Sequence, residues 1–375
     1  MIVMPYPVQV LRQVGFGARS GRRVCKTLRT PYHGVIRSHS LTQTAPARMT
    51  QHLSPSIGVD LGGTKIEVAV LDAERGFLLR ERTPTPHHGY EAILATIAEW
   101  VGMAKQRCRL PVGHPVGVGI PGCIDPFTQR VRGANTQVLN GQRLAHDLAL
   151  RLACPVRIEN DANCLALSEA VDGAARGSQV AFAVILGTGC GAGITLGTQV
   201  WKGRHALAGE WGHNPLPWPT VEEMQIPACW CGQRGCIEGW LSGPGLAADH
   251  LRLTRQNRTP EEIVQAMLKG EAAALDVWRR YIDRLARSLA HVVNMLDPDV
   301  IVLGGGMSKV TRLYADLDGA IGTYAFHRPI HTPIKAALHG DSSGVRGAAW
   351  LSQMTDAMTA MGSAGATIDN HGASA

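Results

Sequence analysis

The stretch IGVDLGGTKIEVAVLD (57–72) decides the fold class, because its two β-branched runs flank a Gly-Gly turn and predict a β-hairpin. Further along, EAILATIAEWVGMAKQRC (91–108) has apolar residues at helical spacing, and VGVGI (116–120) follows Pro111 as a new strand. Helices therefore alternate with strands, which predicts an α/β protein.

The second half of the chain repeats this plan. Residues 180–200 form another predicted hairpin, and although 177–201 carry no charge, five glycines interrupt the run, so we expect a buried sheet and no membrane span. A strand-to-helix passage over 156–177, an amphipathic helix over 276–297 and a strand at 299–308 that runs into three glycines complete the pattern. Two halves built alike are therefore expected.

The formal net charge of +7 comes from the N-terminus. Residues 1–56 contain eight Lys or Arg and no Asp or Glu, and the rest of the chain holds 29 basic and 30 acidic residues. The body is therefore not expected to bind nucleic acid specifically. Prolines and the lack of apolar periodicity predict a disordered extension over 1–55. We favour an upstream start, with Met49 beginning the working protein, over a transit peptide.

The Ala-, Gly-, Ser- and Thr-rich tail over 355–375 is predicted to be disordered as well. Nine cysteines in 375 residues are too few for a disulfide scaffold, and no secretory signal precedes them. We therefore expect a cytoplasmic protein.

Three glycine-rich turns have the composition of a nucleotide site. In DLGGTK (60–65) an acid ends a strand before the turn, so Asp60 is suited to hold hydrated Mg²⁺ while Thr64 and the turn amides contact phosphate. GTGCGAG (187–193) repeats the arrangement without the acid, and GGG (304–306) adds a third turn. A dinucleotide site at GVGIPG (117–122) is disfavoured, because a proline stands where a helix should begin.

Asp161 is the candidate general base for phosphoryl transfer to an alcohol. It lies at a strand-to-helix junction, where the alternative is an acid that caps the helix or stands in its first turn and is stabilised by the helix dipole. The neighbouring Asn160 and Asn163 favour a polyol site over a surface cap.

A cysteine cluster lies within the loop-like, Gly- and Pro-rich segment 203–245. Cys229, Cys231 and Cys236 form a C-x-C-x₄-C run that is too tight for an internal disulfide, and His213 would complete a tetrahedral Cys₃His zinc site. Such a zinc ion is structural, since no position is left for water. Buried free thiols are the alternative.

The motifs also occur together in a recognisable order. Together they resemble the ROK family of sugar kinases, most closely its bacterial fructokinases (manno(fructo)kinases), over about residues 56–353. The motifs that carry the resemblance are DLGGTK, ENDAN (159–163), the GTGCGAG turn, GEWGHNPLPW (209–218), CWCGQRGCIE (229–238) and LGGGMS (303–308).

This resemblance implies a fold: an α/β, two-domain actin-like ATPase (ribonuclease H-like) fold that binds ATP and sugar in an interdomain cleft. It implies a small α/β domain over 56–162, to which a helix at 344–354 returns, and a large α/β domain over 163–343. The zinc-binding loop at 209–238 belongs to the large domain.

The resemblance also implies the roles of single residues, with Asp161 as the base. The residues that it assigns to ATP and its Mg²⁺ are Asp60, Gly62, Gly63, Thr64, Lys65, Gly187, Thr188, Gly189, Gly304 and Gly305. Those that it assigns to sugar hydroxyls are Asn135, Asn160, Asp161, Glu210, His213 and Glu238. For zinc it implies the same ligands as the spacing does: His213, Cys229, Cys231 and Cys236.

The expected reaction is transfer of phosphate from ATP to the 6-hydroxyl of D-fructose, with mannose as a further substrate. GHNPLPW (212–218) and LNGQ (139–142) resemble the fructokinase branch. An N-acetylglucosamine or N-acetylmannosamine kinase is the alternative within the class. A sugar-responsive transcription regulator of the same family is the alternative from another class, although the N-terminal arm lacks the periodicity of a helix-turn-helix domain. A homodimer is usual for such kinases.

Overall fold

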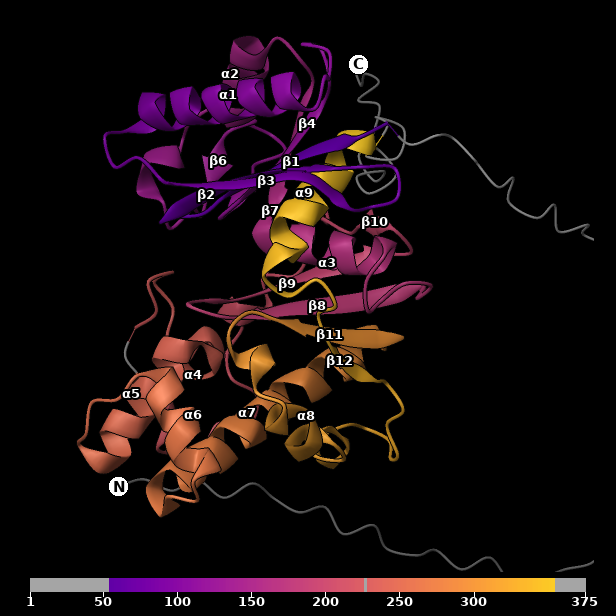
Figure 1. Cartoon of the computed structure of the whole chain (residues 1–375). Helices are drawn as coiled ribbons and strands as arrows, with labels where there is room; N and C mark the ends of the chain where they lie inside the picture. Colours follow the sequence, from indigo (N-terminus) through magenta and orange to yellow (C-terminus); the bar gives the residue numbers. More distant parts are fainter. Residues whose placement is uncertain (1–53, 226–227, 355–375) are drawn as a thin grey trace, which may run out of the picture. The chain divides into compact units, whose positions relative to one another are not determined.

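The computed structural model describes residues 54–225 and 228–354 (Figure 1). Contacts divide the chain into Met1–Thr50 and Gln51–Ala375. Of the segments that the sequence predicts to be disordered, residues 1–53 and 355–375 lie outside the described residues. Among the helices that are described, none is both long enough and apolar enough to cross a membrane.

The first sheet is built around the predicted hairpin and has the order β3-β2-β1-β4-β7. β1 pairs antiparallel with β2 and parallel with β4, and β7 joins β4 in parallel. Two helices, α1 (Tyr90–Arg107) and α2 (Leu144–Leu152), contribute apolar residues to the core of this half. Its strands are β1 (Ser56–Leu61), β2 (Lys65–Leu71), β3 (Phe77–Pro84), β4 (Val116–Ile120) and β7 (Val156–Asn160).

The second sheet repeats the plan in the order β10-β9-β8-β11-β12. β8 pairs antiparallel with β9 and parallel with β11, as β1 does with β2 and β4. The prediction of two halves built alike is therefore confirmed. Its strands are β8 (Val180–Leu186), β9 (Cys190–Leu196), β10 (Gln199–Val200), β11 (Val300–Gly304) and β12 (Ile334–Ala336).

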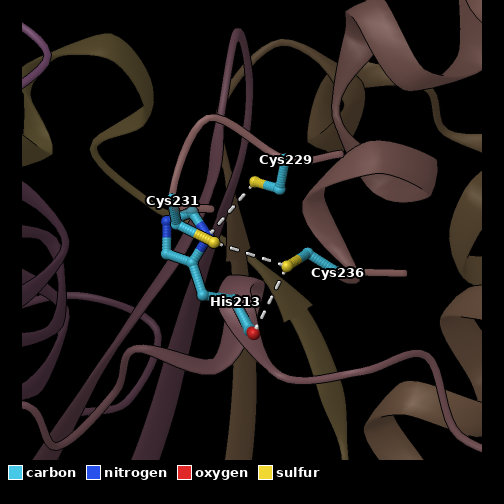
Figure 2. Close-up of side chains that lie close together, drawn as sticks. All are labelled: His213, Cys229, Cys231 and Cys236. Atoms are coloured by element: carbon cyan, nitrogen blue, oxygen red, sulfur yellow. Dashed lines mark hydrogen bonds between the residues drawn. The ribbon is translucent and has the colours of Figure 1, made fainter. Parts of the chain in front are cut away.

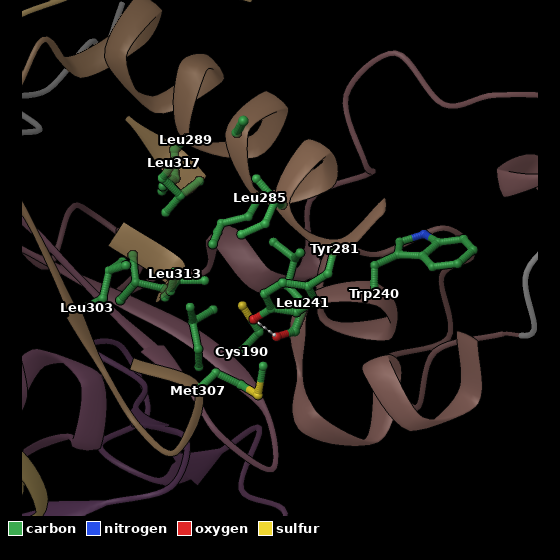
Figure 3. Packing of buried hydrophobic residues seen from close by; sticks show 14 of the residues in the cluster. Cys190, Trp240, Leu241, Tyr281, Leu285, Leu289, Leu303, Met307, Leu313 and Leu317 are labelled. Carbon is green, nitrogen blue, oxygen red and sulfur yellow. Dashed lines mark hydrogen bonds between the residues drawn. The ribbon is translucent and has the colours of Figure 1, made fainter. Parts of the chain in front are cut away.

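Helices α4 to α8 share one apolar core with the second sheet, and α7 supplies much of that core (Figure 3). The predicted helix at 276–297 begins four residues earlier and ends at Leu296, where Asp297 takes the left-handed conformation that closes a helix. The helices are α4 (Glu238–Leu241), α5 (Gly243–Thr254), α6 (Pro260–Leu268), α7 (Ala272–Leu296) and α8 (Arg312–Leu317).

The segment 203–245 is less uniformly loop than its composition predicts. Two short 3₁₀ turns, η2 (Trp211–His213) and η3 (Glu223–Gln225), interrupt it, and α4 and α5 begin inside it. Ser242 caps α5 by accepting a hydrogen bond from the amide of Gly245, and a proline occupies the first turn. Gly and Pro there mark the start of a helix, because proline costs no hydrogen bond in the first turn.

Two helices lie between the sheets (Figure 1): α3 (Asp161–Val171) contacts β8 and β9, and α9 (Ser343–Gln353) contacts β1 and β4. Glycines allow the close packing, because a Cβ at Gly117 would lie 1.8 Å from the carbonyl oxygen of Ala348. α9 is the helix predicted over 344–354. Both helices begin beside the acidic residues of the candidate site.

Smaller elements connect β4 to α2. A two-stranded ribbon, β5 (Cys123–Ile124) and β6 (Val131–Arg132), is followed by the 3₁₀ turn η1 (Gln137–Leu139). Asn140 closes the intervening loop, since it accepts a hydrogen bond from the amide of Ala134 at 2.9 Å and donates one to its carbonyl oxygen.

Candidate active site and metal centre

The first glycine turn is held by its own sheet. The amide of Gly62 donates to the carbonyl of Lys65 at 2.9 Å, and the hydroxyl of buried Thr85, after β3, donates to the carbonyl of Gly62 at 2.7 Å. Gly63 and Thr64 are exposed at the tip. Sequence reasoning missed Thr85, because no local motif connects it to Gly62, which lies 23 residues earlier.

Lys65 stands at the end of this turn. Its ammonium lies 3.8 Å from the carboxylate of Glu67, which is buried and also pairs with Arg80 and Arg82. The lysine side chain is about half exposed, at 45%. Lys65 therefore already has an ionic partner in the protein, and its contact with phosphate stays a prediction.

The second glycine turn is held by distant elements. The amide of Gly187 donates to the carbonyl of Gly189, while the amide of Gly243, at the start of α5, donates to the carbonyl of Gly187 at 2.8 Å. The carboxylate of Glu238 accepts from the amide of Cys190 at 3.0 Å. The turn thus rests on the residues that follow the cysteine cluster.

A cavity of 360 Å³ opens beside this second turn. Gly187 and Thr188 line it, whereas Gly304 packs against Leu165 and Gly305 against the backbone of Leu186. The glycine of the third turn that lines the cavity is Gly306. The other lining residues are Leu186, Gly243, Pro244, Pro260, Glu261, Val264, Gln265, Met307 and Val310. Sequence reasoning missed the helical side of this cavity, which α6 supplies.

Two acidic residues meet where β1 ends and α3 begins. Burial, together with the negative charge of Asp161, raises the pKa of Asp60 to about 7. Burial likewise raises the pKa of Asp161 to about 6, with a smaller contribution from Glu210. Gly344 in the first turn of α9 leaves room for Asp60, since a Cβ there would lie 3.1 Å from its carboxylate. Paired carboxyls with raised pKa values are typical of sites that move a proton or bind a divalent cation.

The helix cap at this junction is Asn160 rather than Asp161. The Asn160 side chain accepts from the amides of Ala162 at 2.8 Å and Asn163 at 3.4 Å, and it donates to the carbonyl of Gly122 at 3.0 Å. Asp161 is the first helical residue. The cap itself is therefore supplied by Asn160, while Asp161 stands in the first turn, where its carboxylate also accepts from the amide of Ala162 at 2.8 Å. The sugar contact expected of Asn160 and the catalytic role of Asp161 stay predictions.

Glu159 holds the junction between β7 and α3 in place through hydrogen bonds and an ion pair. Its carboxylate accepts from the amide of Asn160 at 3.1 Å and from the side chain of Asn163 at 3.0 Å, and its other oxygen lies 2.5 Å from the ammonium of Lys202. Glu159 is 5% exposed. Its partner Lys202 follows β10, so only the tertiary structure identifies the pair.

The GEWGH segment lies directly on β9. A Cβ at Gly212 would lie 1.6 Å from the carbonyl oxygen of Cys190, and Gly209 has a φ of 93°. Both glycines are therefore required for the segment to pack this closely on β9. They bring Glu210 and His213 close together. Burial raises the pKa of Glu210, and the charge of His213 opposes only part of that rise.

Asn135 has no hydrogen bond to the other predicted sugar ligands among the described residues. It is exposed, and its side chain accepts a hydrogen bond from the hydroxyl of Thr136 at 3.4 Å. Arg132, at the end of β6, acts on the site electrostatically: its charge lowers the pKa of Glu210, and it pairs with Asp125 at 3.0 Å. The sequence did not single out Arg132. A sugar contact for Asn135 stays a prediction.

The four expected zinc ligands converge (Figure 2). Their ligand atoms all lie within 4.8 Å of one another, with the sulfur of Cys229 at 3.7 Å from Nδ1 of His213 and the sulfurs of Cys231 and Cys236 at 3.6 Å. A tetrahedron with Zn–S bonds of about 2.3 Å has edges of about 3.8 Å. The residues therefore fit zinc, and the eight cysteines of the described residues are free thiols.

Two buried arginines of α7 anchor the loop between His213 and the cysteines. Arg284 pairs with Glu223 at 2.7 Å, and Arg287 donates to the carbonyls of Pro217 and Trp218 at 2.9 and 2.6 Å. The arginine side chains are 1% and 3% exposed. Charge pattern alone places arginines on a solvated face, so the sequence did not reveal this anchor.

Residues 56–355 match the ROK family. The chain belongs to the ROK family. This ROK protein is 38% identical over 303 residues to an N-acetyl-D-glucosamine kinase of Citrobacter koseri, covering 80% of this chain and 99% of the relative.

Solved structures of ROK proteins share the fold. A ROK hexokinase from Thermus thermophilus is 30% identical with a TM-score of 0.69, over 79% of this chain and 96% of that one. A ROK glucokinase from Streptomyces griseus, solved with glucose and AMPPNP, is 29% identical with a TM-score of 0.66, over 80% and 99%. The expected actin-like ATPase fold is confirmed. These relatives lend no support to the fructokinase branch.

Proposed function

We propose that this protein is an ATP-dependent N-acetyl-D-glucosamine kinase that phosphorylates the primary 6-hydroxyl of the sugar. The observation that carries the proposal is the 38% identity with the Citrobacter koseri N-acetyl-D-glucosamine kinase over nearly the whole of that enzyme. N-acetylglucosamine thus replaces fructose as the proposed substrate. Fructose was expected from two short segments of seven and four residues, and similarity across 303 residues is stronger support than these.

Asp161 is the general base in this proposal. Its carboxyl has a pKa of about 6, so it is largely ionised at neutral pH and takes the proton of the sugar hydroxyl as that oxygen attacks phosphorus. Asn160 caps α3 and so holds Asp161 in place. When bound, Mg²⁺-ATP supplies the phosphoryl group, and Mg²⁺ neutralises its negative charge.

The two glycine turns bind the phosphates in this proposal. Asp60 is placed to hold the hydrated Mg²⁺, while amides of Gly63 and Thr64 on one side and Thr188 on the other contact the phosphate oxygens. The 360 Å³ cavity beside Thr188 takes the nucleoside. Protein amides and metal thus stabilise the charge that the transferred group carries.

Glu210, His213 and Glu238 bind sugar hydroxyls in this proposal. His213 turns Nδ1 toward the sulfur of Cys229, which leaves Nε2 for a sugar oxygen. A zinc ion held by His213 and the cysteines would fix this imidazole without taking part in the chemistry.

The test is ADP release with Mg²⁺-ATP and each of six additions: N-acetylglucosamine, N-acetylmannosamine, glucose, mannose, fructose or none. We expect the highest kcat/KM with N-acetylglucosamine, with NMR locating the phosphate at O6. The highest kcat/KM with fructose would instead support the fructokinase hypothesis. No turnover with any sugar, together with a gel shift at physiological salt, would favour the regulator alternative.

A further inference from the structure

Glu238 joins two parts of the site through its two carboxylate oxygens. Oε2 accepts from the amide of Cys190 at 3.0 Å, and Gly189 lies so close that a Cβ there would be 2.9 Å from the same oxygen. Oε1 accepts from the indole N–H of Trp230 at 2.7 Å. One carboxylate therefore connects the second glycine turn to the cysteine loop.

Trp230 is positioned by the cysteine cluster itself. It stands between Cys229 and Cys231, and its ring meets His213 edge-on, with the centroids 4.9 Å apart. The side chain is 60% exposed, so burial in a core does not hold it. Its contacts with His213 and Glu238 are what place the indole, and both depend on the shape of the loop.

We propose that Trp230 is a positioning residue that holds the Glu238 carboxylate and thereby connects metal binding at the cysteine cluster to the second phosphate turn. An indole N–H bound to a carboxylate is a charge-assisted hydrogen bond, which restrains the carboxylate more strongly than a neutral one. With the cluster in its metal-bound shape, Trp230 keeps Glu238 directed at Cys190. Zinc thus affects the nucleotide side of the site as well as His213.

The proposal rests on the proposed kinase function, but its test uses binding and does not depend on the identity of the sugar. Trp230→Phe keeps the ring and removes the N–H donor. The matched control is Trp218→Phe, since Trp218 lies on the same loop, is 57% exposed and stacks on Tyr324 rather than donating to Glu238. Zinc content, melting temperature and the Kd of Mg²⁺-ADP are measured for both variants and the wild type.

We expect Trp230→Phe to retain zinc and its melting temperature but to bind Mg²⁺-ADP about tenfold more weakly, as loss of a hydrogen bond to a charged group does. Trp218→Phe should bind like the wild type. In the wild type, zinc removal by chelation should weaken ADP binding by a similar factor, while in Trp230→Phe it should add little, because the connection is already broken. Circular dichroism checks the zinc-free folds; should they unfold, the two phenylalanine variants decide the question.

Wild-type ADP affinity in Trp230→Phe would overturn the connection and leave the kinase proposal intact. Loss of zinc from this variant would overturn it as well, because Trp230 would then serve the metal site alone. Failure of the wild type to bind Mg²⁺-ADP at all would overturn both proposals.

Discussion

The two glycine turns have the same place in their sheets but different supports. The turn at Gly62–Lys65 has the acid Asp60 two residues before its first glycine, and it is closed by Thr85, the residue after β3. The turn at Gly187–Cys190 has Ile185 at the position that matches Asp60, and it is closed by Gly243 and Glu238. The first half thus provides the acidic side chain, and residues of that same half hold its turn. The turn of the second half depends instead on the cysteine loop and the helices after it.

This difference shows how a repeated plan acquires distinct roles. A hairpin alone provides backbone amides, and both halves have those. The two turns differ in the side chains that later elements place against them. A substitution that disturbs the structure of one turn should therefore leave the structure of the other unchanged. The following predictions test that separation, beginning with the residue that lies between the halves.

Replacing Asp161 with Asn should have the largest effect on turnover. Without a base, kcat should fall about 10²- to 10⁴-fold. Binding of Mg²⁺-ADP should change little, because neither turn is altered. Steady-state kinetics and calorimetry measure the two quantities, and an Asp161→Asn enzyme with kcat near the wild-type value would exclude Asp161 as the base.

Gly212→Ala should damage the second half alone. Its Cβ would lie 1.6 Å from the carbonyl oxygen of Cys190, so the segment must lift off β9, at a cost to the free energy of unfolding of about 3 kcal/mol. Zinc content should fall with it. Gly239→Ala is the control, because a Cβ there meets nothing within 4 Å. Urea unfolding and metal analysis compare the two variants, and equal stability would show that the approach is less tight than described.

Thr85→Val should damage the first half alone. It leaves the carbonyl of Gly62 without its hydroxyl donor, so we expect a loss of about 1 kcal/mol in unfolding free energy and a rise of a few-fold in the KM for ATP. Zinc content should be unchanged. Thr85→Ser keeps the donor and should retain the wild-type KM. A Thr85→Val protein that lost zinc would contradict the separation of the two turns.

The smallest expected effect is a shift in pH dependence. Since Asp161 acts ionised and its pKa is about 6, kcat/KM should fall as the pH drops through that value. Glu210 raises the pKa of Asp161, so Glu210→Gln should move the acid limb to lower pH by a fraction of a unit. A pH profile of kcat/KM measures the shift, and movement to higher pH would contradict the assigned geometry.

Local patterns carried most of the fold and part of the site. Both hairpins, the junction before Asp161 and the C-x-C-x₄-C run are contiguous, so spacing alone reveals them. Thr85, Lys202 and Arg287 were missed because each acts on a partner far along the chain. The substrate branch was predicted from short segments, and the longer similarity to N-acetylglucosamine kinases points elsewhere.

The sequence by itself determined the alternation of strands and helices, the glycines at the turns and the four residues whose arrangement fits a metal ion, because these follow from local periodicity and residue chemistry. Only the tertiary structure decided that Asn160 caps α3, that the charge of Asp161 acts on Asp60 and helps raise its pKa, and that Glu238 spans from Trp230 to Cys190. Burial and hydrogen-bond geometry depend on which distant segments pack together, and a one-dimensional pattern does not specify that packing.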